Sequence, residues 1–369
     1  MVSAGDWDGS TVFGKGSVMW DTAGFQFLAV SLTSGIVLAE LPDLQVSKLS
    51  YRFGDTTSET ATLPWRNIPS NWGEATVPYG TAVLLVRGSI VLWGGIVVKR
   101  ERTLQGSGLS LTLATIEHYL DRVYVKDHVY SNRDQCEIVA DLVSSTLTDH
   151  RVLFSVESSP SRIRRDRVYE ASSDKTLLSV LQELSAVRNG PEWCTSWESV
   201  GGGMYLPVLT VADRIGSVTP VTTFDESVMT SFKVVEDYTD GYGANMVWAV
   251  GDAAGGDQLR SDTMVADQSY RPVVEHVVRP SSSITRKETL DAYTAASLRQ
   301  LQDGTNTVSM TLSLLAAPIV YEEWMPGDVV SWIVSDDDGR FAGVAQGEAR
   351  VVGYDIDFSG VWTITPVVQ

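Results

Sequence analysis

Short apolar runs separated by turn residues repeat along residues 17–125, beginning with the run at 18–20, and their spacing is that of β-strands. Leu49, Tyr51 and Phe53 alternate with polar neighbours, so one face of that segment is expected to be buried. Such a series of strands joined by short turns indicates antiparallel pairing.

A hairpin is the clearest unit in this region. Residues 82–87 and 90–100 are two apolar runs joined by the two-residue turn Gly88-Ser89. Gly94-Gly95 in the second run indicates a bulge or a sharp bend, as where a sheet curls into a barrel. The pattern fits a small antiparallel barrel or a sandwich, and we predict a first β-barrel domain of residues 1–125.

The periodicity changes between residues 126 and 214. Asp134 is placed to cap a helix whose apolar positions between 138 and 147 fall at helical spacing. Ser173 or Asp174 is expected to cap a second helix, and a strand follows at 205–211. These signals predict an α/β insert domain of residues 126–214.

Strand patterns return in residues 215–369, which we predict to be a second β-barrel domain. The domain is interrupted at about 251–304 by a loop-rich excursion with one helix, from near Thr285 to about Gln302, closed by Gly304. The predicted fold class is α+β and mainly β, with two small antiparallel β-barrels, an α/β insert between them and a helix-containing insert in the second barrel.

Acidic side chains outnumber basic ones, and the net charge is −18 at pH 7. Residues 1–214 hold 19 basic and 24 acidic side chains, whereas residues 215–369 hold 9 and 22. A field of this sign disfavours stable binding to nucleic-acid phosphates. The charge serves either solubility or a surface that must not adhere to nucleic acid.

Cys136 lies in the helical pattern and Cys194 between two tryptophans, and nothing in the sequence requires them to pair. We expect two buried free thiols, which suits a reducing compartment. The first residues, MVSAGDWDGSTVFG, do not have the pattern of a signal peptide. No stretch approaches the roughly 20 apolar residues of a membrane helix. We expect a chain that is made in a cytoplasm and does not insert into a membrane.

Common catalytic and cofactor motifs are missing from the sequence, which has no GxSxG, HExxH, P-loop, paired CxxC or EF-hand spacing. We therefore expect no enzymatic activity, no cofactor and no metal site. Asp336-Asp337-Asp338-Gly339 is interpreted as a hairpin turn, not a cation loop. Glu322 and Glu323 are adjacent, and on a strand they would point to opposite faces, which disfavours a pair of glycosidase carboxylates.

Two features are candidates for subunit contacts. The only dense basic cluster is formed by Arg162, Arg164, Arg165 and Arg167. It is either a solvated segment or a surface that meets the acidic C-terminal portion of a neighbouring subunit, with phosphate binding a third alternative. Trp65 and Trp72 bracket a proline-rich loop, which is either a sugar-stacking surface, a subunit contact or core packing.

The C-terminal region carries a resemblance to a known family. After a helix and a strand come Pro326-Gly327-Asp328 and two valines, then a polar hairpin, and then Arg350-Val-Val-Gly353 before the final strand. Gly327-Asp328 reads as a tight turn that starts a strand. This order resembles the second barrel of phage baseplate hub proteins, which include the hubs of contractile tails, the tail-associated proteins of siphophages and minor tail proteins of phages of actinobacteria.

The resemblance implies a structural virion protein at the distal tip of a phage tail, assembled in the cytoplasm of the bacterial host. It implies a homotrimer in which two barrels per chain alternate into a pseudo-sixfold ring. Such a ring would adapt sixfold to threefold symmetry and surround a channel. Its implied partners are the distal tail protein ring, the C-terminus of the tape-measure protein and other tail-tip or fibre proteins, with genome DNA present only in transit.

Two alternatives stay open from the sequence. A different tail component that binds host carbohydrate would need Trp65 and Trp72 to line an open groove. A cell-wall hydrolase would need two carboxylates that converge in a cleft.

Overall fold

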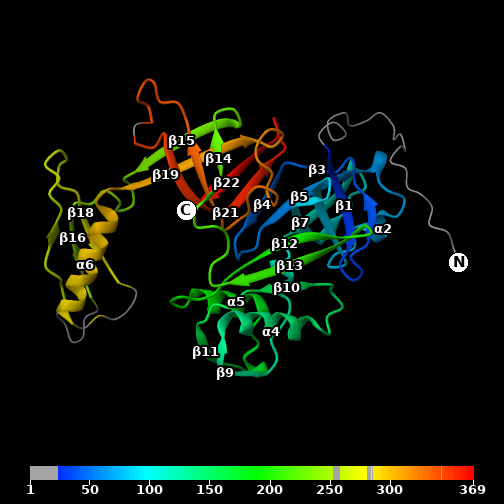
Figure 1. Cartoon of the computed structure of the whole chain (residues 1–369), viewed down its shortest axis with the longest axis horizontal. Coiled ribbons are helices and arrows are strands. Elements are labelled where there is room, and N and C mark those ends of the chain that lie inside the picture. Colours follow the sequence, from blue (N-terminus) through cyan, green and yellow to red (C-terminus); the bar gives the residue numbers. More distant parts are fainter. Residues whose placement is uncertain (1–23, 252–257, 281–283, 285, 342) are drawn as a thin grey trace. The chain divides into compact units, whose positions relative to one another are not determined.

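A computed structural model of the chain describes residues 24–251, 258–280, 284, 286–341 and 343–369 (Figure 1). The chain forms two compact units. Of the described residues, the first unit contains 24–230, 311–335 and 345–369, and the second contains those between 231 and 310 and between 336 and 344. The strand expected at residues 18–20 lies outside the described residues.

The first seven-stranded sheet is built from residues 25–114 and is antiparallel throughout. Its order is β2-β1-β6-β7-β8-β5-β3. The strands are β1 (Phe25–Ser31), β2 (Val37–Glu40), β3 (Gln45–Val46), β5 (Ser58–Pro64), β6 (Thr81–Arg87), β7 (Ile90–Glu101) and β8 (Gly108–Ala114).

The expected hairpin is confirmed as β6 and β7, with Gly88 at a φ of +60° in the turn. The register shifts beside Leu92, which is an unpaired bulge residue two positions before Gly94. A Cβ on Gly94 would lie 2.4 Å from the ring of Trp197, so glycine is needed there for a close approach.

The second seven-stranded sheet has the order β14-β20-β21-β22-β19-β15, and β4 pairs with β21. Its strands are β4 (Lys48–Arg52), β14 (Pro220–Asp225), β15 (Met229–Asp237), β19 (Thr305–Ser313), β20 (Val329–Ile333), β21 (Gln346–Asp357) and β22 (Thr363–Val368). The β14–β20 pair is parallel, and the chain passes into the second unit through β15 and returns through β19. β4 comes from the part of the sequence that we expected to belong wholly to the first barrel.

The chain is mainly β with few helices, as the sequence predicts. Among the described residues, β2 and β3 at the two ends of the first sheet are not hydrogen-bonded to each other. The sheet is therefore open in its hydrogen bonding, and the expected pair of small β-barrels stays a prediction. The second sheet is not antiparallel throughout as expected, because β14 and β20 run parallel.

The central segment, residues 126–214, carries a three-stranded sheet of order β10-β13-β12, two helices, and a ribbon of β9 and β11. Its elements are β9 (His128–Asp134), α4 (Gln135–Leu147), β10 (Ser155–Ser158), β11 (Arg164–Tyr169), α5 (Leu177–Ala186), β12 (Glu192–Gly201) and β13 (Met204–Ala212). The helices and the ribbon share one apolar core with Trp193, Leu209 and Val211 of the sheet.

The first helix cap is confirmed, because the carboxylate of Asp134 accepts a hydrogen bond from the N–H of Cys136. The second cap expectation is wrong. Thr176 caps α5 through its hydroxyl, while residues 171–173 form the short 3₁₀ helix η2 and Asp174 lies at a φ of +47° after it. A left-handed residue ends one helix and so cannot begin the next.

The second unit holds the three-stranded sheet β17-β16-β18, with helix α6 packed on β16 through Leu298 and Val247. The elements are β16 (Met246–Ala249), β17 (Met264–Val265), β18 (Glu275–Val278) and α6 (Lys287–Leu301). The expected helix is confirmed near its bounds, although Thr285 lies outside the described residues. Short helices complete the chain: η1 (Trp65–Asn67), α2 (Trp72–Ala75), α3 (Glu117–Leu120) and η2 (Ala171–Ser173).

Candidate functional site

Two backbone segments meet at the Pro326-Gly327-Asp328 turn. Gly216 has a φ of +81° and Gly327 a φ of +106°. A Cβ on Gly216 would lie 2.1 Å from the carbonyl carbon of Gly327, and a Cβ on Gly327 would lie 2.8 Å from the carbonyl oxygen of Ile215. Both positions therefore require glycine for conformation and for space. The sequence predicted the turn but not the segment against which it packs.

Asp328 ties these two segments together. Its carboxylate is nearly buried and accepts hydrogen bonds from the N–H of Ser217 at 2.7 Å and from the N–H of Met325 at 2.9 Å. One carboxylate oxygen binds the segment that follows β13, and the other binds the turn itself. Asp328 is a structural residue of this contact.

Arg350 completes the contact from β21. Its Nε donates to the carbonyl of Gly327 at 2.9 Å, and its two terminal nitrogens donate to the Glu192 carboxylate at 2.7 and 2.5 Å. It also donates to the carbonyl of Ile215 and lies over the ring of Phe53. We name the Glu192–Arg350 pair the clamp, because it joins β12 of the central segment to the second sheet.

The electrostatics of the clamp favour its charged form. Burial raises the pKa of Glu192, but hydrogen bonds from Arg350 and from the N–H of Ile215 outweigh burial and hold the pKa below its ordinary value. A bidentate guanidinium–carboxylate pair fixes both distance and orientation. The clamp therefore sets how the central segment sits on the second sheet.

Gly353 has a different role. A Cβ there would lie 2.4 Å from the carbonyl oxygen of Tyr51, so glycine lets β4 pair with β21. The rings of Tyr51 and Tyr354 stack across these strands with centroids 5.6 Å apart. Arg350 of the clamp contacts Gly327, and Asp328 and Pro326 lie in the same turn as Gly327. Gly353, the fifth motif residue, allows β4 to pair with the second sheet.

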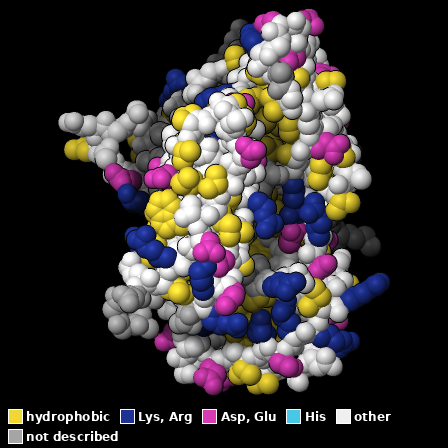
Figure 2. Space-filling view, turned by 90° about the vertical axis from the view of Figure 1, so that its left-hand side faces the viewer, with side chains coloured by type: hydrophobic (Ala, Val, Ile, Leu, Met, Phe, Trp, Pro, Cys, Tyr) yellow, Lys and Arg dark blue, Asp and Glu magenta, His cyan; other side chains and the backbone are white. Residues whose placement is uncertain are grey.

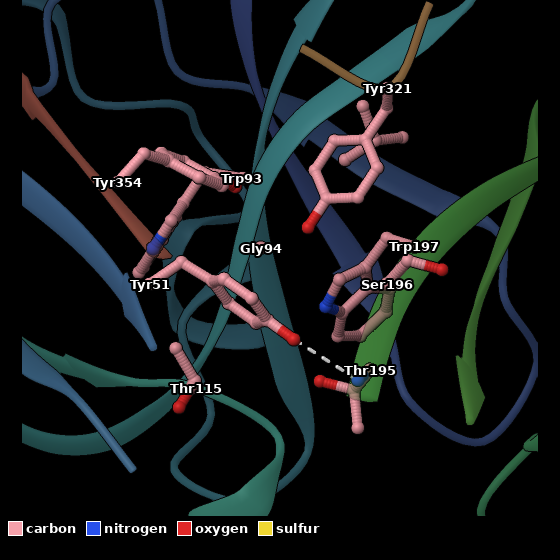
Figure 3. A pocket seen from close by; sticks show the side chains of 10 residues that line it. Tyr51, Trp93, Gly94, Thr115, Thr195, Ser196, Trp197, Tyr321 and Tyr354 are labelled. Atoms are coloured by element: carbon pink, nitrogen blue, oxygen red, sulfur yellow. Dashed lines mark hydrogen bonds between the residues drawn. The ribbon is translucent and has the colours of Figure 1, made fainter. Parts of the chain in front are cut away.

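Tyrosines and tryptophans fill the centre of the first unit, where both large sheets meet β12 (Figure 3). The hydroxyl of Tyr51 accepts a hydrogen bond from the N–H of Thr195 at 3.1 Å, drawn dashed in Figure 3. The hydroxyl of Tyr354 donates to the carbonyl of Leu92 at 2.5 Å. The cavity between these rings has a volume of only about 10 Å³, which is room for one water molecule and no ligand.

Glu117 is fully buried beside this cluster, and the sequence analysis did not single it out. Its carboxyl group accepts a hydrogen bond from the hydroxyl of Thr195. Burial raises its pKa, and the hydrogen bonds from Thr195 and Thr115 offset only part of that rise. No sequence signal marked this burial, because His118 and Asp121 in the same helical turn make a charged residue there unremarkable.

An open cleft of about 520 Å³ lies between β12 and the segment 321–328, with residues 89–91 also in its wall. We name it the acidic cleft after four exposed carboxylates that line it: Glu157, Glu198, Glu322 and Glu323. Trp197 and Trp324 also line it. The expectation that Glu322 and Glu323 point to opposite faces was wrong, because residues 321–323 form a turn and not a strand.

The side chains of the arginine cluster differ in exposure and in hydrogen-bond partners. Arg165 is half-buried, Arg164 donates from Nη1 to the carbonyl of Asn132 at 2.7 Å, and Arg167 donates to the carbonyl of Asp166 at 3.1 Å. Arg165 donates to the side chain of Gln135 at 2.6 Å and to the carbonyls of Arg188 and Asn189 after α5, so it ties β11 to the end of that helix. Arg162 lies at a φ of +65°, and its N–H donates to Asp134 at 2.6 Å. The side chains of Arg162 and Arg164 are exposed, and that of Arg167 lies at the edge of an open hollow with Lys175 and Glu183.

Trp65 and Trp72 contact each other edge to face, with centroids 5.8 Å apart. The guanidinium groups of Arg100 and Arg102 lie over the Trp72 ring at 5.8 and 5.5 Å. The loop thus brings the two tryptophans together, half-buried, with arginines on a ring face that a sugar would otherwise stack against.

Cys136 and Cys194 are free and buried, as expected, and burial raises their pKa values to about 11 and about 12. Asp336 accepts from the N–H groups of Gly339 and Phe341, which confirms a turn. Within the described ranges, no group of three His, Cys, Asp or Glu side chains is placed to hold a metal ion. Nor does any described helix have the length and apolar content to span a bilayer.

No family model matches the sequence, and no curated protein matches it. Solved structures do. A tail protein from Neisseria meningitidis is 14% identical over 94% of this chain and 97% of its own, with a TM-score of 0.51. The 43 kDa tail protein of prophage MuSo2 from Shewanella oneidensis is 11% identical over 93% and 98%, with a TM-score of 0.53. A chain of the PdpA–VgrG complex is 9% identical over 93% and 64%, with a TM-score of 0.50.

These matches extend over almost the whole chain and over almost the whole of the two tail proteins. The chain has the fold of phage tail proteins, and the resemblance seen in the sequence is confirmed at the level of the fold.

Proposed function

We propose that the chain is a structural component of a phage tail and forms the hub at its tip. The observation that carries this proposal is the fold shared with two tail proteins over more than nine tenths of each chain. A shared domain would fit many functions, but a fold shared along almost the whole chain fits a shared place in an assembly better.

The proposed assembly is a homotrimer. Each chain supplies two sheets, and three copies would alternate six sheets around a channel, adapting a sixfold tail tube to a threefold tip. In this proposal the domains are residues 1–125, 126–214 and 215–369, and the two large sheets act as barrels. Its neighbours would be the distal tail protein ring, the tape-measure protein and other tail-tip or fibre proteins, on a virion assembled in the host cytoplasm.

The proposed role is non-enzymatic, and the chemistry of the motif residues supports it. Asp328, Arg350 and Glu192 direct their hydrogen bonds at one another and at backbone groups. Polar groups bound in this way position segments and are not available to a substrate. The arginines over Trp72 likewise favour a subunit contact over carbohydrate stacking for Trp65 and Trp72.

Light scattering of the purified chain over a range of concentrations tests the proposal. A species of three times 40.2 kDa is the expected result. The chain should also bind a hexameric distal tail protein with three copies per hexamer. A monomer that neither self-associates nor binds such a ring would overturn the proposal.

A further inference from the structure

Four carboxylates of the acidic cleft lack a basic partner. Among the described residues, Glu157, Glu198, Glu322 and Glu323 form no ion pair with any Lys, Arg or His. Burial and the neighbouring charge of Glu157 raise the pKa of Glu198, so two of these groups already repel each other. A cation placed between them would relieve that repulsion.

The cleft also has an apolar side. Trp197, Trp324 and Met325 line it together with the carboxylates. A groove with an apolar floor and an acidic rim fits a protein surface that carries both apolar and basic side chains.

The chain carries a surface of that composition on β9 and β11. Val129 and Val168 form a cross-strand pair and are 77% and 64% exposed. Arg164 and Arg167 belong to the same strand as Val168, with Arg167 lining the hollow beside α5, and Arg162 precedes the strand. No described carboxylate forms an ion pair with the guanidinium groups of these three residues. We name these five residues the basic ribbon. Figure 2 shows one face of the molecule, with Lys and Arg side chains gathered in its lower half among Asp and Glu side chains.

The two surfaces lie on opposite sides of the central three-stranded sheet. Trp193, Leu209 and Val211 face the helices, and the ribbon packs on the far side of that core through Tyr130 and Tyr169. Cys194 and Thr210, which alternate with them along the strands, line the acidic cleft. The ribbon of one copy therefore cannot reach its own cleft.

We propose that the basic ribbon of one copy docks in the acidic cleft of the next copy. Such a contact is head-to-tail, and a head-to-tail contact generates a ring when its rotation closes. The inference rests on the proposed trimer and assigns one of its interfaces. The occupant is a second copy because the chain itself supplies matching charge and apolar side chains on both partners.

Charge reversal tests the contact. R164E/R167E changes the ribbon from three positive charges to a net charge of −1, and E198K/E322K cancels the four negative charges of the cleft. Each change is expected to weaken self-association at least about tenfold, because it removes the attraction between the two surfaces or replaces it by repulsion. A chain with all four substitutions again places opposite charges at positions 164 and 167 and at positions 198 and 322, and it is expected to associate more strongly than the R164E/R167E variant. R122E/R151E and E40K/E59K are the matched controls, with the same charge change outside both surfaces, and they are expected to associate as the unchanged chain does.

Chemical cross-linking tests the contact where association is weak. R164K/R167K keeps the charge and supplies amines, which a carbodiimide couples to carboxylates that touch them. Mixed isotope-labelled and unlabelled chains are expected to give links from residue 164 or 167 to residue 157, 198, 322 or 323 of the other copy. If both double variants form trimers as strongly as the unchanged chain and no such link is found, the inference is overturned, while the proposed function is unaffected. A cleft that captures a basic segment of a different protein, with self-association unchanged by E198K/E322K, would also overturn it.

Discussion

At the scale of single residues, the clamp is the best-defined interaction in the chain. The side chains of Arg350 and Glu192 are only 20% and 27% exposed, and they lie 2.5 Å apart at their closest atoms. Arg350→Met would leave Glu192 without its partner and is expected to lower the free energy of unfolding by about 1–3 kcal/mol. Urea unfolding measures this.

Lys99→Met provides the comparison, because Lys99 pairs with Glu101 at 65% and 54% exposure. Loss of that exposed pair is expected to lower the free energy of unfolding by no more than about 0.5 kcal/mol. An equal loss in both variants would show that the clamp contributes no more than a surface ion pair.

Gly216 is expected to tolerate no side chain. Gly216→Ala places a side chain on a left-handed residue and overlaps the backbone at Gly327. We expect the free energy of unfolding, measured in urea, to fall by about 2–5 kcal/mol, or the chain to fail to fold. Gly88→Ala has a φ of +60° in open space, so it carries only the conformational cost of about 1 kcal/mol. Similar stability of the two variants would refute the close contact at Gly327.

The titration of Glu117 gives a pH dependence with a definite sign. Burial raises its pKa above the ordinary 4.5, so the folded chain holds this proton more tightly than the unfolded chain. Its contribution is fully present below pH 4.5 and declines as the pH rises through the folded value. Glu117→Gln removes the titration, and the free energy of unfolding of the unchanged chain should fall relative to this variant between pH 5 and pH 8. A constant difference across that range would contradict the burial of an ionisable group here.

At the scale of elements, Arg165 is expected to stabilise the joint between β11 and α5. Arg165→Ala removes hydrogen bonds to Gln135 and to two carbonyls after α5. The free energy of unfolding is expected to fall by about 1–2 kcal/mol. Arg162→Ala changes an exposed side chain and is expected to change stability by less than about 0.5 kcal/mol. Hydrogen exchange of amides in residues 164–186 distinguishes the two, with faster exchange only for Arg165→Ala.

The sequence predicted elements where a local pattern specifies them. The β6–β7 hairpin, the Asp134 cap and the helix near 287–301 all follow from residues within one turn or one strand. Partners far apart in the chain carry no such local signal. β4 has the alternation of any half-buried strand, and nothing in it specifies pairing with β21, about 300 residues later. The cap of α5 was misplaced because Ser173, Asp174 and Thr176 are equivalent in a propensity argument, and backbone conformation decides among them.

In the candidate site too, the sequence predicted local features but not contacts between distant segments. The letters of Pro326-Gly327-Asp328 predicted a turn, which the structure contains. Arg350 and Glu192 are 158 positions apart, and their pairing depends on how β12 lies on β21. The acidic cleft was missed because Glu157, Glu198 and Glu322 come from three distant segments.

At the scale of the whole molecule, we propose that copies of this chain form a threefold ring at a tail tip. The fold shared with tail proteins supports a place in a phage tail, and the basic ribbon and the acidic cleft are the proposed head-to-tail contact. Electron cryomicroscopy of the assembled chain tests this proposal. We expect three copies around a central opening, with the β9–β11 ribbon of each copy against segment 321–328 of the next. Rings of another symmetry, or particles that hold one copy at every concentration and with the distal tail protein present, would contradict it.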